Sequence, residues 1–397
     1  MPNFISYHEA TLPDLLLAGR AELFKGQHCP SMGIAISGYD RSFTYAVDSD
    51  GLRLLPGTDT AAFTVEMCES DWQGMVADLE SVPGILYGGR LLGHQGDLMQ
   101  FMRWDPLLRA LYTGRPLFDE RRFDLTDKRG RPLNPASRLS ADSDPAAMRE
   151  FLDAAGYLLV GNVFEEDEIE TFRAAALDLA GSARADDQQS WWGKSRSGEA
   201  VLCRILNSGK HAAFKGLYED ERIARLAGLL PGGMLHPSPE SKDGVTVVFK
   251  NPDVKEGLSD LPWHRDCGMG GHAAMCPCYV FSLYLYDATP DSGCLQFLPG
   301  SHHYGCGFLD AAAGEIAGVL TVPARAGDIT IHIGDVMHAA PPPLAADGPF
   351  RQSVLLSFHP DFKNHRGERH YNDVLLGAED GQVGNLRDTV SESSGRQ

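Results

Sequence analysis

The sequence lacks the features of a membrane-spanning or secreted protein. It contains no stretch of about 18 consecutive apolar residues, the length needed to cross a bilayer. The N-terminus has no basic segment followed by an apolar run, so no signal peptide is expected. No internal repeat is evident. We therefore expect a cytoplasmic protein that does not insert stably into a membrane.

The sequence is also poor in positive charge. It has 35 lysines and arginines against 54 aspartates and glutamates, which gives a formal net charge of −19. Proteins that bind nucleic acid or anionic lipid through general electrostatics carry the opposite balance. We expect neither partner for this chain.

The eight cysteines do not show the paired C-x-x-C spacing of most structural zinc sites. In a long chain without a signal peptide, reduced thiols are expected rather than a disulfide framework. Small buried apolar side chains are the simplest interpretation. A zinc cluster that includes His272 is the alternative, because four cysteines crowd one region: Cys267, Cys276, Cys278 and Cys294.

What is present is the composition of a globular protein, with 43% hydrophobic and 22% charged residues. A length of 397 residues suits two domains or one enlarged domain. Between Phe43 and Met67, short apolar runs alternate with turn signals and predict a small antiparallel sheet. Helices are predicted at 71–79, with Ser70 as N-cap, and at 97–112. The buried side of the second helix would consist of Leu98, Phe101, Met102, Leu108 and Leu111.

The first 118 residues resemble the sterol carrier protein domain. The resemblance is carried by the helix that opens at Ser70–Asp71–Trp72, by the segment 86–91 (LYGGRL) and by Gly96–Asp97–Leu98. It implies a small α/β fold that encloses an apolar tunnel for lipids or sterols. Trp72, Phe101 and Met102 can equally be ordinary core residues.

Charged and turn residues replace periodic apolar ones at 119–143, which we interpret as a linker. A second domain is predicted at 144–378 and a polar tail at 379–397. Asp144 as N-cap and Pro145 in the first turn predict a helix that ends at Gly156.

The second domain continues with a predicted strand at 157–160 and a helix at 167–179. The polar, Gly-rich segment 183–213 is predicted to be irregular, with Trp191 and Trp192 exposed as a lid or substrate wall. An internally packed loop is the alternative.

Further short strands are predicted, separated by Gly and Pro turns, which is typical of a sandwich or a double-sheet barrel. They lie at 245–249, 279–286, 295–298, 328–331 and 353–358.

One stretch of the second domain has the pattern of a metal site. His264 and Asp266 lie two residues apart in a predicted strand, so they share one face and can reach one ion. A third ligand is available in the segment 327–338, from either His332 or His338. Two histidines and one carboxylate form the ligand set of non-haem iron(II) oxygenases.

Residues 145–360 resemble the phytanoyl-CoA dioxygenase family. Besides the H-x-D pair, the resemblance rests on 156–160 (GYLLV) before an acidic helix start and on 291–302 (DSGCLQFLPGSH). Gly327–Asp328, a following histidine and a later arginine complete it. The resemblance implies a double-stranded β-helix, or jelly roll, so the whole chain is expected to be α+β: a jelly-roll catalytic domain plus a small N-terminal α/β sterol-carrier-like domain.

By this resemblance the metal ligands are His264, Asp266 and His338, whereas His332 and His302 are structural histidines. The cofactors implied are iron(II), 2-oxoglutarate as cosubstrate and O2. Arg351 and Ser353 match the family's R-x-S pattern. A dicarboxylate chelated at one end needs a cation at the other, and a guanidinium binds a carboxylate through two hydrogen bonds. One departure is the run Ala339–Pro343, which replaces the polar residues that often follow the distal histidine.

The implied reaction is decarboxylation of 2-oxoglutarate to succinate coupled to oxidation of a C–H bond, and Asp266 argues against halogenation. The N-terminal resemblance predicts a small hydrophobic substrate, lipid-, sterol- or natural-product-like. The N-terminal domain could instead mediate a homodimer. Candidate pocket residues are Trp191, Trp192, Phe249 and Trp263. Two alternatives are a lipid carrier with a structural metal and a cupin-type dioxygenase that needs no 2-oxoglutarate, which Arg351 and Ser353 disfavour.

Overall fold

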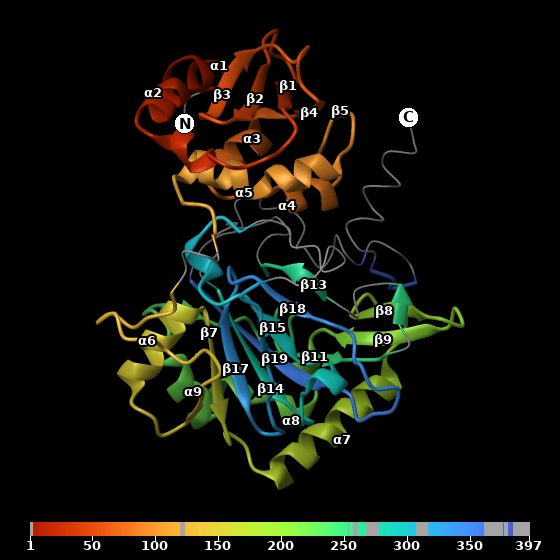
Figure 1. The fold of residues 1–397 in the computed structure, drawn as a ribbon. Helices are drawn as coiled ribbons and strands as arrows, with labels where there is room; N and C mark the ends of the chain where they lie inside the picture. The colour runs from red at the N-terminus through yellow and green to blue at the C-terminus, as the bar shows by residue number, and fades with distance from the viewer. Residues whose placement is uncertain are drawn as a thin grey trace.

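The chain is divided into two units with separate hydrophobic cores. The computed structural model describes residues 3–119, 124–252, 254–256, 261–266, 278–306, 317–360, 376 and 380–383. One core is built from residues between Phe4 and Tyr112, which we name the N-terminal unit. The other lies between Met148 and Phe358, in the C-terminal unit. Figure 1 shows the two units one above the other, with helices α4 and α5 of the first facing the second.

The N-terminal unit contains a five-stranded sheet of order β3-β2-β1-β4-β5 within the described residues. Its strands are β1 (Met32–Ile36), β2 (Phe43–Asp48), β3 (Gly51–Pro56), β4 (Phe63–Met67) and β5 (Gly93–Gln95). The predicted strands in 43–67 are confirmed. The prediction of a purely antiparallel sheet is wrong, because β1 pairs in parallel with β4. Sequence analysis did not identify β1, a short apolar run with no polar alternation to mark it.

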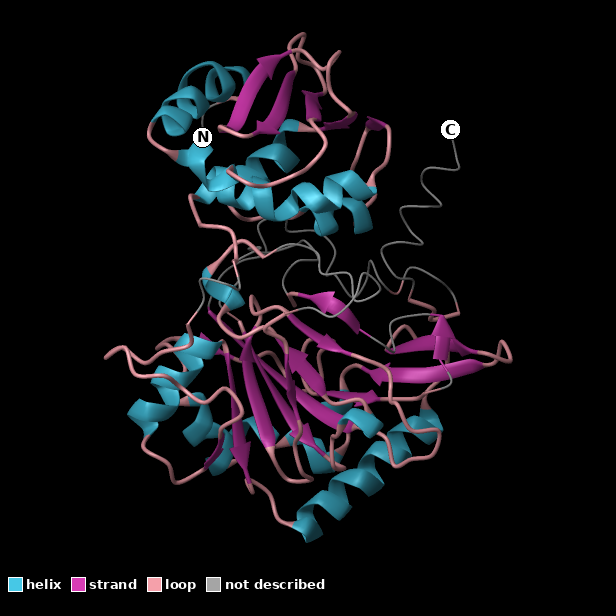
Figure 2. Cartoon of the chain, viewed as in Figure 1, coloured by secondary structure: helices cyan, strands magenta, loops and turns pink. Residues whose placement is uncertain are grey.

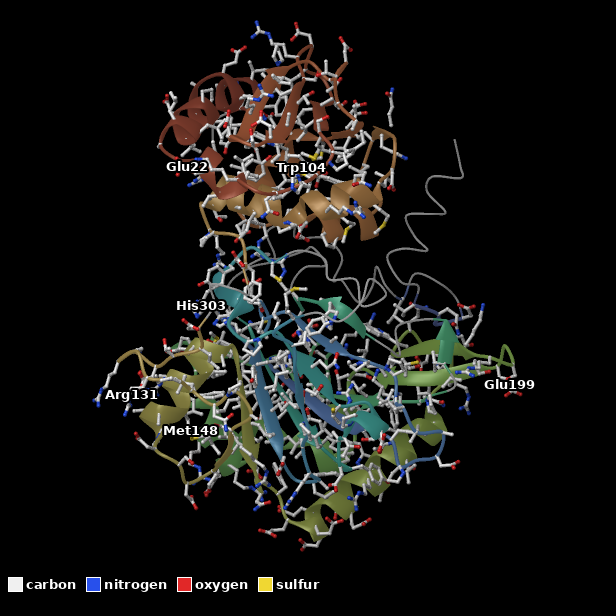
Figure 3. The ribbon with its side chains drawn as sticks, viewed as in Figure 1. Glu22, Trp104, Arg131, Met148, Glu199 and His303 are labelled. Atoms are coloured by element: carbon white, nitrogen blue, oxygen red, sulfur yellow. The ribbon has the colours of Figure 1, made fainter. Side chains whose placement is uncertain are left out.

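Helices cover one side of this sheet, and large side chains fill the space between the helices and the sheet (Figures 1 and 3). Trp72, Tyr45, Phe101 and Trp104 are essentially inaccessible to solvent, and all five residues predicted for the buried side of the second helix are buried. Ser70 is not the N-cap, because the helix starts at Glu69, two residues before the predicted start, and Cys68 occupies the N-cap position. The helices are α1 (Phe4–Ser6), α2 (Leu12–Leu17), α3 (Glu69–Val76), α4 (Val82–Tyr87) and α5 (Met99–Thr113).

The C-terminal unit is built on two sheets, and Figure 2 shows its helices outside the strands. Within the described residues the larger sheet has the order β12-β8-β9-β11-β19-β14-β17-β7-β6, with β10 paired to β19. The five strands predicted between 245 and 358 are confirmed. The members of this sheet are β6 (Arg138–Ser140), β7 (Tyr157–Gly161), β8 (Ser190–Ser195), β9 (Ala200–Ile205), β10 (Met234–Leu235), β11 (Thr246–Phe249), β12 (Val254–Glu256), β14 (Tyr279–Tyr284), β17 (Ile329–Ile333) and β19 (Gln352–Pro360).

The smaller sheet has the order β13-β18-β15-β16. It consists of β13 (Leu261–His264), β15 (Leu295–Phe297), β16 (Leu320–Val322) and β18 (His338–Ala340). β13 lies at the edge, so within the described residues it has one strand neighbour, β18. A β-rich core of two sheets is consistent with the predicted jelly roll.

The helix predictions for the start of the C-terminal unit are confirmed. The Asp144 side chain accepts the Ala146 N–H at the start of α6 (Pro145–Ala155), and Gly156 ends that helix in a left-handed conformation, φ 82°. A side chain at Gly156 would also collide with the His302 ring, since a Cβ there would lie 2.6 Å from Nδ1. The remaining helices are α7 (Glu166–Ser182), α8 (Ala212–Lys215) and α9 (Glu221–Ala227).

The prediction that 183–213 is irregular is wrong for the centre of this segment, where β8 and β9 form an antiparallel pair. Trp191 is buried and Trp192 is only partly accessible, so neither is the exposed aromatic that we predicted. The Trp192 backbone N–H donates to the Gly381 carbonyl at 3.0 Å. Residues 380–383 are the described part of the predicted tail.

The segment between the units is partly incorporated into the larger sheet. β6 falls inside the predicted linker 119–143 and pairs in parallel with β7. The boundaries of two domains and a linker stay a prediction. Among the described residues, no helix is long and apolar enough to cross a membrane.

Six cysteines lie in the described part of the chain, and none of these six forms a disulfide. Cys278 and Cys294, two members of the alternative zinc cluster, are buried, as expected for small apolar side chains. Cys267, His272 and Cys276 lie outside the described residues.

Candidate metal centre

Two neighbouring chain segments bring His264, Asp266 and His338 together. His264 is the last residue of β13 and pairs with His338, the first residue of β18. Asp266 lies two residues beyond the end of the strand, and its backbone N–H donates to the Gly334 carbonyl at 2.9 Å. The ladder is irregular between Leu261 and His264. The shared face that we predicted from strand alternation is therefore produced by a strand end and the following turn.

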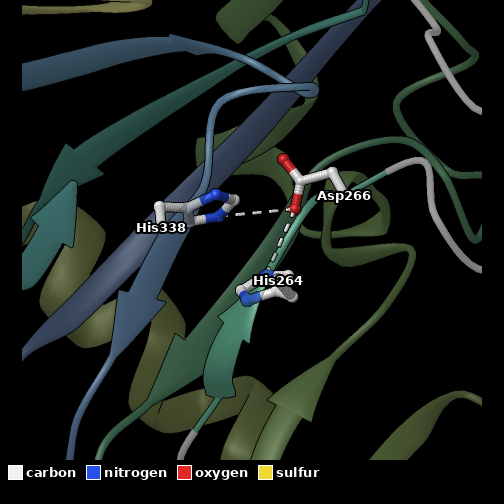
Figure 4. Close-up of side chains that lie close together, drawn as sticks. All are labelled: His264, Asp266 and His338. Carbon is white, nitrogen blue, oxygen red and sulfur yellow. Dashed lines mark ion pairs between the residues drawn. The ribbon is translucent and has the colours of Figure 1, made fainter. Parts of the chain in front are cut away.

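The three side chains converge on one point (Figure 4). Asp266 Oδ1 lies 3.5 Å from Nε2 of His264 and 3.5 Å from Nε2 of His338. One donor atom from each residue can be chosen such that all three lie within 4.8 Å of one another. The exposed fraction of the side chain is 24% for His264, 28% for Asp266 and 5% for His338. The group is thus open to solvent on the side of the first two residues.

The protonation states favour cation binding. Burial opposes ionisation of Asp266, but His338 and hydrogen bonds from His264 and His332 hold its pKa well below the usual range. Burial and the neighbouring His264 keep the pKa of His338 well below that of an ordinary histidine. A carboxylate and a neutral imidazole are the forms that ligate metals.

A backbone contact leaves Nε2 of His338 available as a metal ligand. Its Nδ1 lies 3.0 Å from the Val336 carbonyl, which can only accept, so Nδ1 carries the proton. Nε2 therefore turns an unprotonated lone pair toward Asp266. This arrangement, in which the other ring nitrogen is fixed by a hydrogen bond, is common among metal-binding histidines.

His332 contacts the other oxygen of the same carboxylate. Its Nε2 lies 3.0 Å from Asp266 Oδ2, and the residue is almost completely buried in β17. Because a carboxylate only accepts, His332 donates from Nε2 and fixes the orientation of Asp266. Oδ1 is left to face His264 and His338. His332 thus lies in a strand with a hydrogen-bonded ring, the surroundings that we predicted for it.

The donor set fits iron(II). Two imidazoles and one carboxylate on a partly open face leave positions for further ligands, as in the non-haem iron(II) oxygenases. Within the described residues, this is the group of His, Cys, Asp and Glu side chains that could hold one ion.

Arg351 and Ser353 lie at the start of β19, in the larger sheet. Arg351 is 4% exposed and Ser353 is fully buried. Ser353 lies between Val248 of β11 and Tyr284 of β14, and its Oγ has no hydrogen-bond partner among the described residues. A buried hydroxyl without a partner is costly and suggests a ligand that accepts from it.

A buried tyrosine lies close to Arg351. Burial raises the pKa of Tyr284 to about 12, and the nearby Arg351 charge opposes that rise. The Tyr284 hydroxyl also lies 3.1 Å from Thr330 Oγ1. These groups are neutral, so Arg351 supplies positive charge to an otherwise uncharged set of hydroxyl groups.

The structure places the four predicted pocket residues in different surroundings. Trp191 is buried in β8 beneath the Arg204 guanidinium, 4.7 Å from the ring centre. Trp192 donates from Nε1 to Ser190 Oγ at 2.8 Å. Phe249 is partly buried and pairs with Gln352, next to Arg351.

Trp263 is buried next to His264. It packs in a small apolar cluster with Leu298, Cys306, Met337 and Ala339. It therefore supports the ligand-bearing strands from within, and its part in a substrate pocket, like that of the other three aromatic residues, stays a prediction.

Three charged residues beside the site were not predicted. Arg265 lies between His264 and Asp266, Asp335 lies three residues before His338, and Lys250 follows β11; all three are buried. Lys250 Nζ donates to the Ala340 carbonyl. Strand alternation could have indicated Arg265, because a residue between two ligands points away from the metal and needs a partner elsewhere. Sequence spacing carries no signal for the other two.

His302, predicted to be a structural histidine, is buried and contacts a backbone carbonyl. Its Nε2 lies 3.0 Å from the Asp153 carbonyl. Burial and the neighbouring His303 lower its pKa to about 4, so the ring is neutral at pH 7.

The ligand set and the two-sheet core define a class, the non-haem iron(II)- and 2-oxoglutarate-dependent dioxygenases, which use O2 as the oxidant. The chain belongs to the phytanoyl-CoA dioxygenase family, since the sequence model described as "Phytanoyl-CoA dioxygenase (PhyH)" matches residues 152–350.

Similar proteins match about half of the chain or less. The ectoine dioxygenase of Stutzerimonas stutzeri (strain A1501) is 28% identical over 163 residues, which are 40% of this chain and 51% of that protein. The chain thus spans about half the length of this curated relative. Among solved structures, AviO1 from Streptomyces viridochromogenes is 26% identical, with a TM-score of 0.43, over 55% of this chain and 96% of that chain. EctD from S. alaskensis, solved with 2-oxoglutarate and 5-hydroxyectoine, is 19% identical, with a TM-score of 0.42, over 57% of this chain and 81% of that chain.

Proposed function

We propose that this chain uses iron(II), 2-oxoglutarate and O2 to hydroxylate, or otherwise oxidise, a C–H bond of a small hydrophobic molecule. The observation that carries the proposal is the convergence of His264, Asp266 and His338 on one point, with donor atoms within 4.8 Å of one another. The bound iron would supply the centre at which 2-oxoglutarate is decarboxylated and O2 is activated. The role of the chain is to hold and orient the metal, the cosubstrate and the substrate.

The side chains around the triad keep it ready for the metal. His332 would hold Asp266 through Oδ2, and the Val336 carbonyl would hold His338 through Nδ1. Neither ligand then has to change its protonation or rotate when the metal binds. Because Asp266 fills the carboxylate position, we propose an oxidation rather than a halogenation, in which a halide would need that place.

Arg351 and Ser353 would hold the cosubstrate at its other end. A guanidinium gives a carboxylate two parallel hydrogen bonds, and the buried Ser353 hydroxyl can donate a third. Held at that end, the cosubstrate would have its 2-oxo acid end free to bind the metal. Because both residues are buried, water would be excluded from the ion pair with the cosubstrate, which would strengthen it.

The substrate class and the N-terminal unit complete the proposal. A sterol-carrier-like N-terminal unit is supported by its mixed sheet with helices on one side. In this structure large aromatic side chains occupy its interior, so lipid binding there requires them to move. A small hydrophobic substrate oxidised at the metal centre, the four aromatic pocket residues and a homodimer stay predictions.

The test begins with the chain reconstituted under anaerobic conditions with iron(II) and 2-oxoglutarate. We expect a visible metal-to-ligand charge-transfer band, and release of succinate once O2 is admitted. His264→Ala should abolish both, whereas His28→Ala, at an exposed position, should abolish neither. A His264→Ala variant with unchanged succinate release would contradict the proposed reaction.

The cosubstrate site is tested by two further variants. Arg351→Ala should weaken 2-oxoglutarate binding by about 100-fold, because it removes the partner of a buried carboxylate. Ser353→Ala should weaken it by about ten-fold, through one lost hydrogen bond to a charged group. Without 2-oxoglutarate, Ser353→Ala should not be less stable than the unsubstituted chain, since it removes a buried hydroxyl that has no partner among the described residues.

Substrate screening by product mass then separates the candidate classes. Fatty acyl, sterol and polyketide-like compounds represent the proposed class. Ectoine, the compound in the name of the curated relative, is the polar competitor. An added-oxygen product from ectoine alone would overturn the hydrophobic substrate while leaving the reaction type intact.

A further inference from the structure

A cluster of three arginines and three aspartates lies where the N-terminal unit meets the metal-binding segments. Its members come from both units. Four of them are at most 9% exposed: Asp105, Arg109, Arg265 and Asp335. We name it the junction cluster; its members are Asp78, Asp105, Arg109, Arg115, Arg265 and Asp335.

Helix α5 contributes two members of the cluster from one face. Asp105 and Arg109 are four residues apart, so they lie one turn apart on the same side of the helix. Asp105 Oδ2 accepts from Arg265 Nη2 at 2.7 Å. Arg109 donates from Nη1 to Asp335 Oδ1 and from Nε to Asp78 Oδ1, both at 3.2 Å.

Asp335 is bound from three directions. Besides Arg109, it accepts from Arg115 Nη1 at 3.0 Å through Oδ2. Arg265 Nη1 lies 3.7 Å from its Oδ1. Arg115 Nη1 also donates to the His302 carbonyl at 2.8 Å. The cluster therefore contains equal numbers of positive and negative groups, and each aspartate contacts at least one arginine.

The members from the C-terminal unit belong to the two segments that carry the metal ligands. Arg265 lies between His264 and Asp266. Asp335 follows Gly334, whose carbonyl accepts the backbone N–H of Asp266. α5 thus contacts both ligand-bearing segments at once, one through Asp105 and the other through Arg109.

The first of these segments needs support from outside its own sheet. β13 is a four-residue edge strand with an irregular ladder, and Asp266 lies beyond its end. Among the described residues, β18 is its strand partner on one side. The Arg265–Asp105 ion pair, 2.7 Å between Nη2 and Oδ2, joins this segment to α5.

We propose that the junction cluster is a positioning device for the metal centre, so that the N-terminal unit holds the metal ligands in their binding geometry. This inference rests on the proposed function, because it takes His264, Asp266 and His338 as the metal ligands. Arg265, Asp105, Arg109 and Asp335 are positioning residues and do not contact the metal. Removing a hydrogen-bond partner of a metal ligand typically lowers metal affinity by about 10- to 100-fold, and we expect the lower end here because the cluster acts through the backbone on either side of Arg265.

The test measures the binding of cobalt(II), a redox-stable probe, to the full chain in the absence of 2-oxoglutarate. Asp105→Asn keeps an oxygen that can accept the Val82 N–H, now at 2.9 Å, but removes the charge that faces Arg265. We expect this variant to bind cobalt(II) about ten-fold more weakly or worse, with an altered visible absorption spectrum. Arg265→Gln should behave in the same way.

A double variant separates positioning from general damage. If the two residues act as one pair, Asp105→Asn combined with Arg265→Gln should lose no more affinity than the worse single variant. Affinity losses that multiply in the double variant would contradict coupling through this pair.

Asp71→Asn is the matched control. Asp71 is as buried as Asp105 and pairs with Arg90 at 2.5 Å, inside the N-terminal unit. It should lower thermal stability while leaving the cobalt(II) affinity and spectrum unchanged. An equal loss of cobalt(II) affinity in Asp71→Asn would show that any destabilisation of the unit is sufficient, and would overturn the proposal.

His264→Ala separates failure of this inference from failure of the metal site itself. If His264→Ala binds cobalt(II) as tightly as the unsubstituted chain, the metal site is wrong and the inference falls with it. If His264→Ala abolishes binding while a folded Asp105→Asn keeps the original affinity and spectrum, the inference alone is wrong. Should Asp105→Asn fail to fold, Arg265→Lys keeps the charge but not the planar fork, and its cobalt(II) spectrum should still change.

Discussion

His8 is a neutral histidine that the N-terminal core holds on both ring nitrogens. It is 1% exposed and stacks on Phe43 with ring centres 4.4 Å apart. Nδ1 donates to the Phe4 carbonyl at 2.7 Å, so Nε2 accepts from the Tyr45 hydroxyl at 2.6 Å. Burial lowers the pKa of His8 to about 4, against the opposing effect of the Phe4 carbonyl. The folded state therefore disfavours its protonation.

This pKa predicts a loss of stability in mild acid. The unfolded chain takes up a proton at His8 below about pH 6.5, whereas the folded chain does so only near pH 4. The neutral His8 therefore contributes about 3 kcal/mol to the free energy of unfolding. This contribution is fully present above pH 6.5 and is lost as the pH falls from 6.5 to 4.

Urea unfolding measured across this pH range checks the prediction. His8→Gln should be less stable at pH 7, because it loses the ring contacts, yet its free energy of unfolding should fall less steeply between pH 6.5 and pH 4. His28→Gln, at an exposed position, is the control. A slope that is identical in His8→Gln and the unsubstituted chain would be incompatible with a buried neutral His8.

At the scale of single residues, the sequence indicates site residues where they lie close together along the chain. The H-x-D pair was found because alternation in an extended chain is a local property. The choice of His338 over His332 came from resemblance, and the structure gives the two histidines different oxygens of Asp266. Strand alternation could have indicated Arg265 itself, but its partner Asp105 is 160 residues away in the sequence. No local pattern can indicate such a contact.

At the scale of elements, an ion pair fixes the edge of the larger sheet. Arg138 of β6 donates from Nε and Nη2 to the two carboxylate oxygens of Asp328, at 2.9 and 2.7 Å. Asp328 is fully buried and also accepts the backbone N–H groups of Asn162 and Arg325. The pair thus holds the short parallel strand β6 against β7 and the start of β17.

Arg138→Met should destabilise the chain by about 2 kcal/mol. Removing one partner of a fully buried pair costs roughly 3–5 kcal/mol, but the Arg138 side chain is 33% exposed and two backbone donors remain on Asp328. Arg131→Met is the matched control, since Arg131 is 67% exposed in its pair with Asp127 and should change stability little. Equal urea midpoints for the two variants would argue against a structural role for the Arg138 pair.

Elements with a strong local signal were predicted well, and those defined by distant pairing were not. α6 carries a cap, a proline and a terminal glycine within one short segment. β8 and β9 carry polar and glycine residues, and their strand state depends on pairing with each other and with β11 and β12. Tertiary pairing therefore overrode the turn-like composition of 183–213.

At the scale of the whole molecule, the two units are joined by buried charge rather than by an apolar interface alone. Sequence composition predicted two parts, but it could not predict that α5 shares the junction cluster with the segments that carry the predicted metal ligands. The Arg109–Asp335 contact spans 226 residues of sequence. A buried pair of this kind is costly to break, so the relative position of the two units is strongly constrained around it.

Coupling between the units has to be reciprocal. If the junction cluster increases the affinity of the metal centre, metal binding must stabilise the cluster by the same free energy. We therefore predict that cobalt(II) slows amide hydrogen exchange in α5, around Asp105 and Arg109, although neither residue is a metal ligand. The effect follows because the metal fixes His264 and Asp266, and thereby the Arg265 side chain between them.

Hydrogen exchange with mass-spectrometric detection, with and without cobalt(II), tests this reciprocity. Peptides from α5 in the unsubstituted chain should gain protection when the metal binds. In Asp105→Asn the gain in α5 should largely disappear, even at cobalt(II) concentrations that saturate the site, while the gain around His264 and His338 remains. Asp71→Asn should keep the full α5 response, because its ion pair lies away from the ligand-bearing segments. Metal-dependent protection that stays confined to the C-terminal unit in the unsubstituted chain would mean that the junction cluster carries no coupling.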